Sequence, residues 1–344
     1  MELITAEQVD RASLQAFLRK NYPPERADFL GEHGAWQHHT DANRLVIQVE
    51  GQVAAYCAVI PGNIQAAGRK HSVLWWVDLI VDPAFRGRGL QTVLDQQVRQ
   101  MSDTLLGFPN ALAAKIHRKH GWGVREDLQV FLLPLQPRRV KSIRSATGVR
   151  GKLLRLAALA LEPAARGLCW RLQSLKVHGA RRVYPTSPAL LASVWEKHAH
   201  QAYNTAWRDE PYVQWRYLSA PYCSQLSFYT AGDPQAPSHY LVARQMQLNG
   251  LRFTRILDFF GDLQDTPALH DLLLLASQDA IRQGSAQVTL ITSLPGLQPI
   301  LRRLGFWIST PIGFCWQSRS PELMDILAGP MHWTLADSDN DAPD

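Results

Sequence analysis

A short basic, glycine-rich segment is the part of this sequence best suited to binding an anionic ligand. Residues 81–90 read V-D-P-A-F-R-G-R-G-L, after an apolar run and before a helical pattern. Gly87 and Gly89 lack a Cβ, so the backbone there can approach a ligand closely. The following helix start directs unpaired N–H groups and its positive dipole end at that ligand, and Arg86 and Arg88 add full positive charges. The segment therefore predicts a pyrophosphate cradle at a strand-to-helix turn.

Two common phosphate-binding motifs do not fit the cradle. A P-loop has four residues between its glycines and then Lys-Ser or Lys-Thr, and a dinucleotide-binding turn needs a third glycine after Gly89. The segment instead resembles the V-x-P-x-x-R-G-x-G signature of the GNAT acyltransferases, which in that family binds the pyrophosphate of acetyl-CoA. The resemblance implies acetyl-CoA, or another acyl-CoA, as co-substrate. The cofactor-binding residues that it implies are Leu79, Ile80, Val81, Arg86, Gly87, Arg88, Gly89, Leu90, Gln91 and Asn110.

Gln91 departs from the family pattern, which usually has Gly or Ala at this place. Its side chain crowds the helix start, but its amide can hydrogen-bond a phosphate or the pantetheine arm of CoA. The alternative to a cofactor site is a basic strand-to-helix turn without a ligand.

A second segment, 110–122, is predicted to be a helix with a defined start and end. Asn110 can cap its first turn, and Gly121 suits the left-handed conformation that commonly ends a helix. The segment resembles the GNAT helix that ends in "fYeklGF" and passes beside the thioester, with His117 at the tyrosine position. In many relatives that tyrosine protonates the leaving CoA thiolate, so the resemblance implies His117 as a general acid. The alternative is a histidine that only interacts favourably with the helix C-terminus.

Asp78 is the second candidate catalytic residue. It lies within the apolar run that leads into the cradle, where a carboxylate is costly unless it is paired or faces a cleft. In GNAT relatives an acidic residue of this strand often takes a proton from the attacking amine, directly or through water. The resemblance therefore implies Asp78 as a general base, and a salt bridge within the sheet is the alternative.

The order of expected elements in the first part of the chain is repeated after residue 187. The sequence Leu304-Gly305-Phe306 stands where His120-Gly121-Trp122 stands in the first part. The repeat has no second cradle, because the turn after its strand 251–260 reads G-D-L-Q-D and its aspartates would repel a pyrophosphate. We expect this half to bind no CoA and to close over the acceptor. The candidate substrate residues are Trp215, Arg216 and Asp258, with structural bracing as the alternative role.

Charge is unevenly distributed along the 344 residues. The net charge is +6, but residues 138–182 contain twelve Lys or Arg and one acid, Glu162, and so carry +11. This segment has helical apolar patterns, so it is either a spacer with a solvated basic face or a helix that contacts an anionic membrane surface. No nucleic-acid recognition motif accompanies the basic residues, so we expect no nucleic-acid partner.

Composition indicates an ordinary globular protein of the cytoplasm. The four cysteines are scattered without C-x-x-C spacing, which indicates neither a metal site nor a disulfide framework. The N-terminus shows no signal-peptide pattern, and no apolar run is long enough to span a bilayer. The sequence leaves the oligomeric state open.

These observations predict an α/β protein built from two GNAT-like domains, each a mixed central sheet flanked by helices. We expect an acetyl-CoA-binding catalytic domain (1–136), a basic helical linker (137–186), a second domain without the cradle (187–335) and a disordered acidic tail (336–344). The expected activity is direct transfer of an acetyl group to an amine, such as an amino sugar of a cell-surface polysaccharide precursor. The alternatives are an aminoacyl or longer-chain acyltransferase and a non-catalytic acyl-CoA sensor or scaffold.

Overall fold

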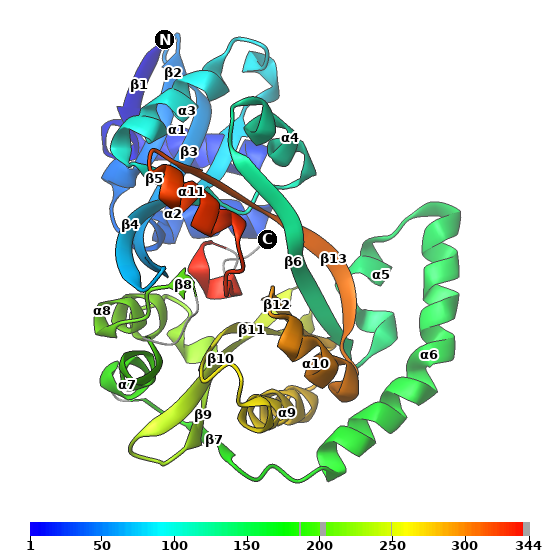
Figure 1. Cartoon of the computed structure of the whole chain (residues 1–344). Helices are drawn as coiled ribbons and strands as arrows, with labels where there is room; N and C mark the ends of the chain where they lie inside the picture. The colour runs from blue at the N-terminus through cyan, green and yellow to red at the C-terminus, as the bar shows by residue number, and fades with distance from the viewer. Residues whose placement is uncertain (186, 200–203, 249, 340–344) are drawn as a thin grey trace.

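The computed structural model describes residues 1–185, 187–199, 204–248 and 250–339 (Figure 1). In this part of the chain the strands belong to one mixed sheet. The strands are β1 (Glu2–Thr5), β2 (Arg44–Val49), β3 (Gln52–Ala66), β4 (Arg69–Val81), β5 (Thr104–Gly107), β6 (Gly123–Pro134), β7 (Ala180–Val183), β8 (Thr205–Ala206), β9 (Leu226–Gly232), β10 (Pro237–Leu248), β11 (Leu251–Gly261), β12 (Gln287–Thr292) and β13 (Trp307–Ser318).

The α-helices lie on the two faces and at the edges of this sheet. They are α1 (Arg11–Asn21), α2 (Pro24–Gln37), α3 (Leu90–Met101), α4 (Ala111–Lys119), α5 (Lys141–Ser145), α6 (Gly148–Ser174), α7 (Ala189–His198), α8 (Glu210–Val213), α9 (Thr266–Arg282), α10 (Gln298–Leu304) and α11 (Pro321–Ala328).

The two halves of the chain exchange their last strands. The strand order is β1-β2-β3-β4-β5-β13-β6-β12-β11-β10-β9-β7, and β8 pairs with β3. Thus β5 of the first half pairs with β13 of the second, and β12 of the second half pairs with β6 of the first. This pairing joins both halves into one sheet, so residue 136 is a change of region in the sequence but not a division of the structure.

Alternating side chains give the first half its two packed faces. Val46, Tyr56 and Ala58 pack on the side of α1 and α2, whereas Ile47 and Cys57 pack on the side of α3. This alternation follows from the two-residue period of a strand, which sends successive side chains to opposite faces. The core on the α1 side continues into the second half, where α7 packs on β10 and β11.

The structure confirms the predicted fold class, a mixed α/β arrangement of two GNAT-like halves, with no second R-G-x-G turn after β11. The linker region forms α5 and α6 and also provides β7, which pairs with β9 at the edge of the sheet. No helix in the described ranges is both long and apolar enough to cross a membrane.

The prediction of a disordered tail is wrong for residues 336–339. Ala336, Asp337 and Ser338 are buried, and a short 3-10 helix spans Leu335–Asp337. The acidic composition of this segment suggested solvation, but Asp337 forms an ion pair with the buried Arg208 (2.9 Å). Residues 340–344, the rest of the predicted tail, lie outside the described residues.

Candidate functional site

A bulge in β4 opens the sheet at the site. Tyr56 pairs with Ile80 and Ala58 with Val77, so two residues of β4, Asp78 and Leu79, lie opposite a single residue of β3. Asp78 has a φ of 55°, in the left-handed region that Asp tolerates better than most residues. Such a bulge bends a strand and disrupts its ladder.

Beyond the bulge, β4 and β5 diverge. These parallel strands pair only through Leu74 with Leu105 and Trp75 with Leu106, although β4 continues to Val81. The edge of β4 at Leu79, Ile80 and Val81 therefore faces an opening rather than a neighbouring strand. This edge is where the sequence placed three cofactor-binding residues.

The cradle follows directly from β4. Gly87 and Gly89 have φ values of 80° and 75°, and no atom lies within 4 Å of the position that a Cβ would take on either residue. Gly89 is the N-cap of α3 and provides no side chain to cap it. The first N–H groups of α3 thus face open space, as an anion-binding helix start requires.

The turn before the glycines is held by local interactions. Asp82 accepts a hydrogen bond from the backbone N–H of Ala84 (2.9 Å) and forms an ion pair with Lys20 (2.6 Å). The hydrogen bond from Lys20 lowers the pKa of Asp82. Arg86 and Arg88 are exposed, with Arg88 over the ring of Phe85. The cradle therefore presents two solvent-accessible cations beside an uncapped helix.

A cavity of about 450 Å³ lies along the cradle and the free edge of β4. Every cofactor-binding residue expected from the sequence lines it except Arg88. Asn110 is the N-cap of α4, as predicted, and its side-chain oxygen accepts from the N–H groups of Leu112 (3.1 Å) and Ala113 (2.9 Å).

A second cavity, of about 240 Å³, continues from the first between β4 and the connection from β5 to α4. Leu79, Asn110 and Ala113 line both cavities, so the two spaces adjoin. Both predicted catalytic residues, Asp78 and His117, line this second cavity. We call it the thioester cleft, after the bond that the resemblance to the GNAT family would place there.

Asp78 is held in a buried network in the thioester cleft. Its carboxylate accepts from Arg26 Nε (3.1 Å) and contacts His38 Nε2 (3.1 Å), and its backbone carbonyl accepts from the Tyr22 hydroxyl (2.6 Å). Burial alone raises the pKa of Asp78, but the charge of Arg26 and the hydrogen bond from His38 outweigh it and lower the pKa to about 2. A carboxylate so strongly stabilised in its charged form is a weak base.

His117 is buried among aromatic rings. Its ring lies 5.4 Å from that of Trp76 and 4.6 Å from that of Trp122, measured between centroids. Burial lowers the pKa of His117 to about 4. The imidazole is therefore neutral near pH 7, and it does not carry the extra proton that an imidazolium acid would donate.

Asp339 is a cleft residue that sequence reasoning missed. Its carboxylate accepts from Arg26 Nη2 (2.8 Å), and its side chain keeps 24% of its exposure. Burial and the nearby Asp78 raise the pKa of Asp339, against the opposing charge of Arg26. No local pattern signals this contact, because Arg26 and Asp339 are 313 residues apart in the chain.

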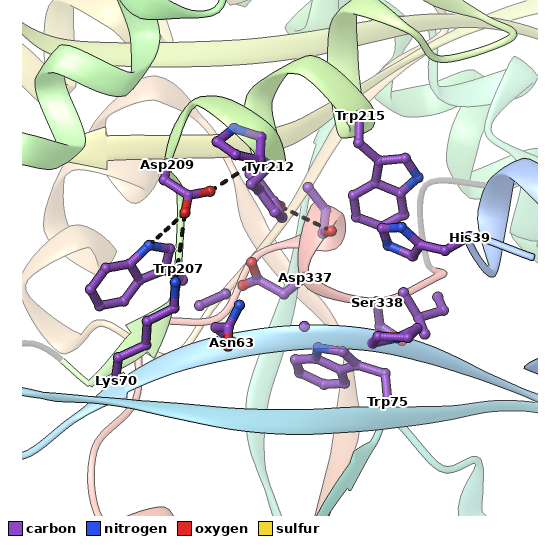
Figure 2. A pocket seen from close by; sticks show the side chains of 16 residues that line it. His39, Asn63, Lys70, Trp75, Trp207, Asp209, Tyr212, Trp215, Asp337 and Ser338 are labelled. Carbon is purple, nitrogen blue, oxygen red and sulfur yellow. Dashed lines mark hydrogen bonds and ion pairs between the residues drawn. The ribbon is translucent and has the colours of Figure 1, made fainter. Parts of the chain in front are cut away.

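A third cavity, of about 340 Å³, is lined by residues of both halves (Figure 2). Trp75 and Ser338 line this cavity, while their neighbours Trp76 and Asp339 line the cleft. Four aromatic side chains and six polar ones share its wall. The labelled residues in Figure 2 are His39, Asn63, Lys70, Trp75, Trp207, Asp209, Tyr212, Trp215, Asp337 and Ser338.

Two pairs define the polar and aromatic ends of this third cavity. Asp209 accepts a hydrogen bond from Trp207 Nε1 (2.9 Å), and Lys70 lies 3.8 Å from Asp209 and over the Trp207 ring. At the other end, His39 stacks on Trp215 with ring centroids 4.1 Å apart. The wall thus combines ring faces with charged groups.

The structure separates the three predicted substrate residues. Trp215 lines the third cavity, but Arg216 and Asp258 are fully buried and line none of the three cavities. Asp258 accepts from Arg208, Tyr217, Tyr240 and Thr334. This set satisfies the oxygens of Asp258 within the fold, which favours the alternative of structural bracing over substrate contact.

Comparisons with known proteins agree with this geometry. The model of the acetyltransferase (GNAT) family matches residues 11–121, which include the bulge, the cradle and α4. No protein with a curated description matches the sequence significantly.

Several solved structures share the fold over 92% of this chain. A GCN5-related N-acetyltransferase from Anabaena variabilis is 15% identical, with 72% of its chain covered and a TM-score of 0.60. Saccharomyces cerevisiae N-myristoyltransferase with bound myristoyl-CoA is 13% identical, with 82% covered and a TM-score of 0.63. A GCN5-related N-acetyltransferase from Kribbella flavida is 13% identical, with 71% covered and a TM-score of 0.55. At these identities the likeness concerns the fold alone.

Proposed function

We propose that this protein is an acyl-CoA-dependent N-acyltransferase that transfers an acetyl group to an amine, because residues 11–121 match the acetyltransferase (GNAT) family model and the chain has a tandem GNAT fold. One observation carries the proposal: the open helix start at Gly89 adjoins a cavity that continues into a cleft between diverging strands. In this arrangement the pyrophosphate would lie on the cradle and the thioester in the cleft. The backbone of β4 would orient the pantetheine arm and help polarise the thioester carbonyl.

An acetyl or similarly short acyl group fits the cleft better than a long chain. Trp76, His117 and Trp122 form a packed wall on one side of a space of about 240 Å³. Opening this wall for a long chain would disrupt a buried aromatic cluster, which is energetically costly. A series of acyl-CoA donors of increasing chain length is therefore expected to show falling turnover.

Asp339 is the better candidate for the general base. The pKa of Asp78 is about 2, whereas that of Asp339 is raised above its ordinary value, so Asp339 is the stronger base of the two. We assign Asp78 to a positioning role, in which it holds the bulge through Arg26 and His38. We expect Asp339→Asn to reduce kcat while the Kd for acetyl-CoA stays within about twofold.

The third cavity is proposed to bind the amine acceptor. Its ring faces suit the apolar side of a flat or cyclic molecule, while Asn63, Lys70 and Asp209 can bind hydroxyl or charged groups. An amino sugar combines both properties, so it is the acceptor class to test first. Trp215→Ala is expected to raise the KM for the acceptor without changing the Kd for acetyl-CoA.

The first experiment is a calorimetric titration of acetyl-CoA into the wild-type protein and a Gly89→Trp variant. We expect micromolar binding to the wild type and none to the variant, whose side chain would fill the cradle. Gly51→Trp is the matched control, because Gly51 has a φ of 76° and equally open surroundings but lies in the hairpin turn between β2 and β3, outside the cradle. Equal binding to the wild type and Gly89→Trp would disprove the site.

Turnover distinguishes an enzyme from a sensor. Release of free CoA thiol would be measured with a panel of amino sugars and other amines at saturating acetyl-CoA. CoA release that needs both an amine and an intact cradle supports the transferase. Tight acetyl-CoA binding without CoA release to any amine would instead favour the acyl-CoA sensor.

A further inference from the structure

The helix α6 has two apolar faces, and only one of them is covered by the protein. Ala158, Ala165 and Leu172, spaced seven residues apart, are buried against α9 and the region around α5. In Figure 1, α6 runs along the edge of the molecule, away from the sheet. The covered face is thus the inner one.

The outer face of α6 is apolar as well. Val149, Leu153 and Leu156 keep 75%, 62% and 63% of their exposure, and Trp170 further along keeps 73%. The spacings of four and three residues place the first three on one side of the helix. Leu156 lies two residues before the buried Ala158, about 200° around the helix, which places it opposite the covered side.

Basic side chains flank this outer face. Lys152, Arg155, Arg166 and Arg171 are all exposed. The acid of the helix, Glu162, is half-buried and accepts a hydrogen bond from the backbone N–H of Arg138 (3.0 Å). The outward surface of α6 therefore combines bulky apolar side chains with positive charge.

We propose that the outer face of α6 binds an anionic phospholipid surface, with the helix lying in the plane of the interface. Lipid acyl chains would cover the leucines and Trp170, and phosphate headgroups would meet the basic flanks. Nucleic acid would satisfy the charges but leave the apolar residues in water. A second copy of this chain would cover the leucines but bring the same positive charge against them, which costs free energy.

Vesicle co-sedimentation tests the proposal on the full chain. Vesicles of phosphatidylcholine with and without phosphatidylglycerol are mixed with the wild type and a Leu153→Glu/Leu156→Glu variant. We expect the wild type to sediment with anionic vesicles only and to be released by salt, because screening weakens the charge attraction. The variant is expected to lose at least about tenfold in apparent affinity, since it places two carboxylates on the apolar face.

Two controls keep the result interpretable. Tyr184→Ala removes an aromatic side chain that is 78% exposed but lies outside α6, and it is expected to bind vesicles like the wild type. Acetyl-CoA binding and circular dichroism check that each variant remains folded, which the exposure of Leu153 and Leu156 favours.

Three outcomes would overturn the proposal. These are failure of the wild type to bind anionic vesicles, unchanged binding by the leucine double variant, and equal binding to neutral vesicles. Ultracentrifugation without lipid adds a fourth: a wild-type dimer that the leucine substitutions dissociate would assign the outer face to a second copy.

Discussion

The two halves of this molecule carry the same strand, turn and helix at corresponding places, but only the first half leaves the helix start open. In the first half β4 leads into α3, whose N-cap is Gly89; in the second half β11 leads into α9, whose N-cap is Asp265. The Asp265 carboxylate accepts a hydrogen bond from the N–H of Ala268 (3.1 Å). It thereby occupies the place of an external anion and repels one. The comparison indicates that one capping residue can separate an anion site from a structural turn.

The openings between strands differ in the same way. β4 and β5 diverge after two paired positions, and so do β11 and β12. The first opening is the thioester cleft, whereas the C-terminal segment lies in the second. There His332 Nε2 lies 2.9 Å from the carbonyl of Phe259, and Ser293 donates to the carbonyl of Met331. The second half thus uses its own chain to fill the space that the first half keeps open.

Each half also has an aspartate beside a bulge, paired with an arginine. Asp78 pairs with Arg26, and Asp258, next to the bulge in β11, pairs with Arg208. Because the C-terminal segment fills the opening at this place, we expect the Asp–Arg pair of the second half to stabilise the fold. The repetition supports a positioning role for Asp78 as well.

The largest expected effect is a loss of stability at the opening between β11 and β12, which the C-terminal segment fills. Arg208→Met would leave Asp258 and Asp337 buried without their cation, and should lower the free energy of unfolding by about 3–5 kcal/mol. Urea denaturation followed by fluorescence measures this loss. We expect Arg26→Met to cost less, because Asp339 remains partly exposed at the cleft. Equal losses of unfolding free energy from the two substitutions would contradict the distinction between a filled opening in the second half and an open one in the first.

Gly89→Asp tests the caps by giving the first half the residue type of the second. Aspartate tolerates the left-handed φ of 75°, so the fold should persist. Its charge at the helix start should weaken acetyl-CoA binding by about 100-fold, measured by calorimetry. Asp265→Gly in the second half should create no new site, since the turn before it, residues 261–264, contains no arginine. Gly51→Asp is the control for a left-handed glycine elsewhere.

His117→Leu makes α4 of the first half resemble α10 of the second, because each of these helices is followed by a glycine. Gly121 and Gly305 both have left-handed φ values, and the residue four positions earlier is His117 in one half and the buried Leu301 in the other. The folded-state pKa of His117, about 4, lies below its ordinary value of 6.5, so the unfolded chain takes up the proton first as the pH falls. The wild type should therefore lose stability between about pH 6.5 and pH 4, and the variant should avoid roughly 2–3 kcal/mol of that loss.

Denaturation curves across this pH range measure the effect of His117→Leu. We expect kcat to stay within a few-fold of the wild type, since the histidine is neutral at pH 7. A tenfold or larger fall in kcat with unchanged acetyl-CoA affinity would restore His117 as a participant in proton transfer.

The smallest expected effect comes from removing the Asp265 cap of α9. Asp265→Ala should destabilise the protein by about 1 kcal/mol without altering acetyl-CoA binding. Asn110→Ala removes a comparable cap from α4 in the first half, and it should lower the free energy of unfolding by a similar amount. It should also weaken acetyl-CoA binding, because Asn110 lines the cavity along the cradle. A weaker cofactor affinity in both variants would show that the effect is global rather than local.

Much of the fold and the outline of the cofactor site could be predicted from short stretches of sequence. The glycine pattern of the cradle, the Asn110 cap and the Gly121 stop depend on residues within a few positions of one another, so local conformational preferences reveal them. The repeated order of elements likewise predicted two GNAT-like halves, because hydrophobic periodicity records which faces are buried.

Ion pairs between distant segments left no such local signal. The partners of Asp78 are 40 and 52 residues away in sequence, and no spacing rule predicts them. The acidic end of the chain read as solvated, because its composition gives no indication of the buried Arg208 and Arg26 that receive it. The same limit applies to Asp258, whose satisfied oxygens became evident only with its neighbours in place.

The sequence alone determined the form of the cradle, because a helix start with glycines and arginines is a property of ten adjacent residues. Only the tertiary structure decided which acids are charged, which gaps are filled and which apolar helix face is left exposed. Burial, desolvation and ion pairing depend on what surrounds a group in three dimensions. In this protein those surroundings come from both halves and from the last residues of the described chain.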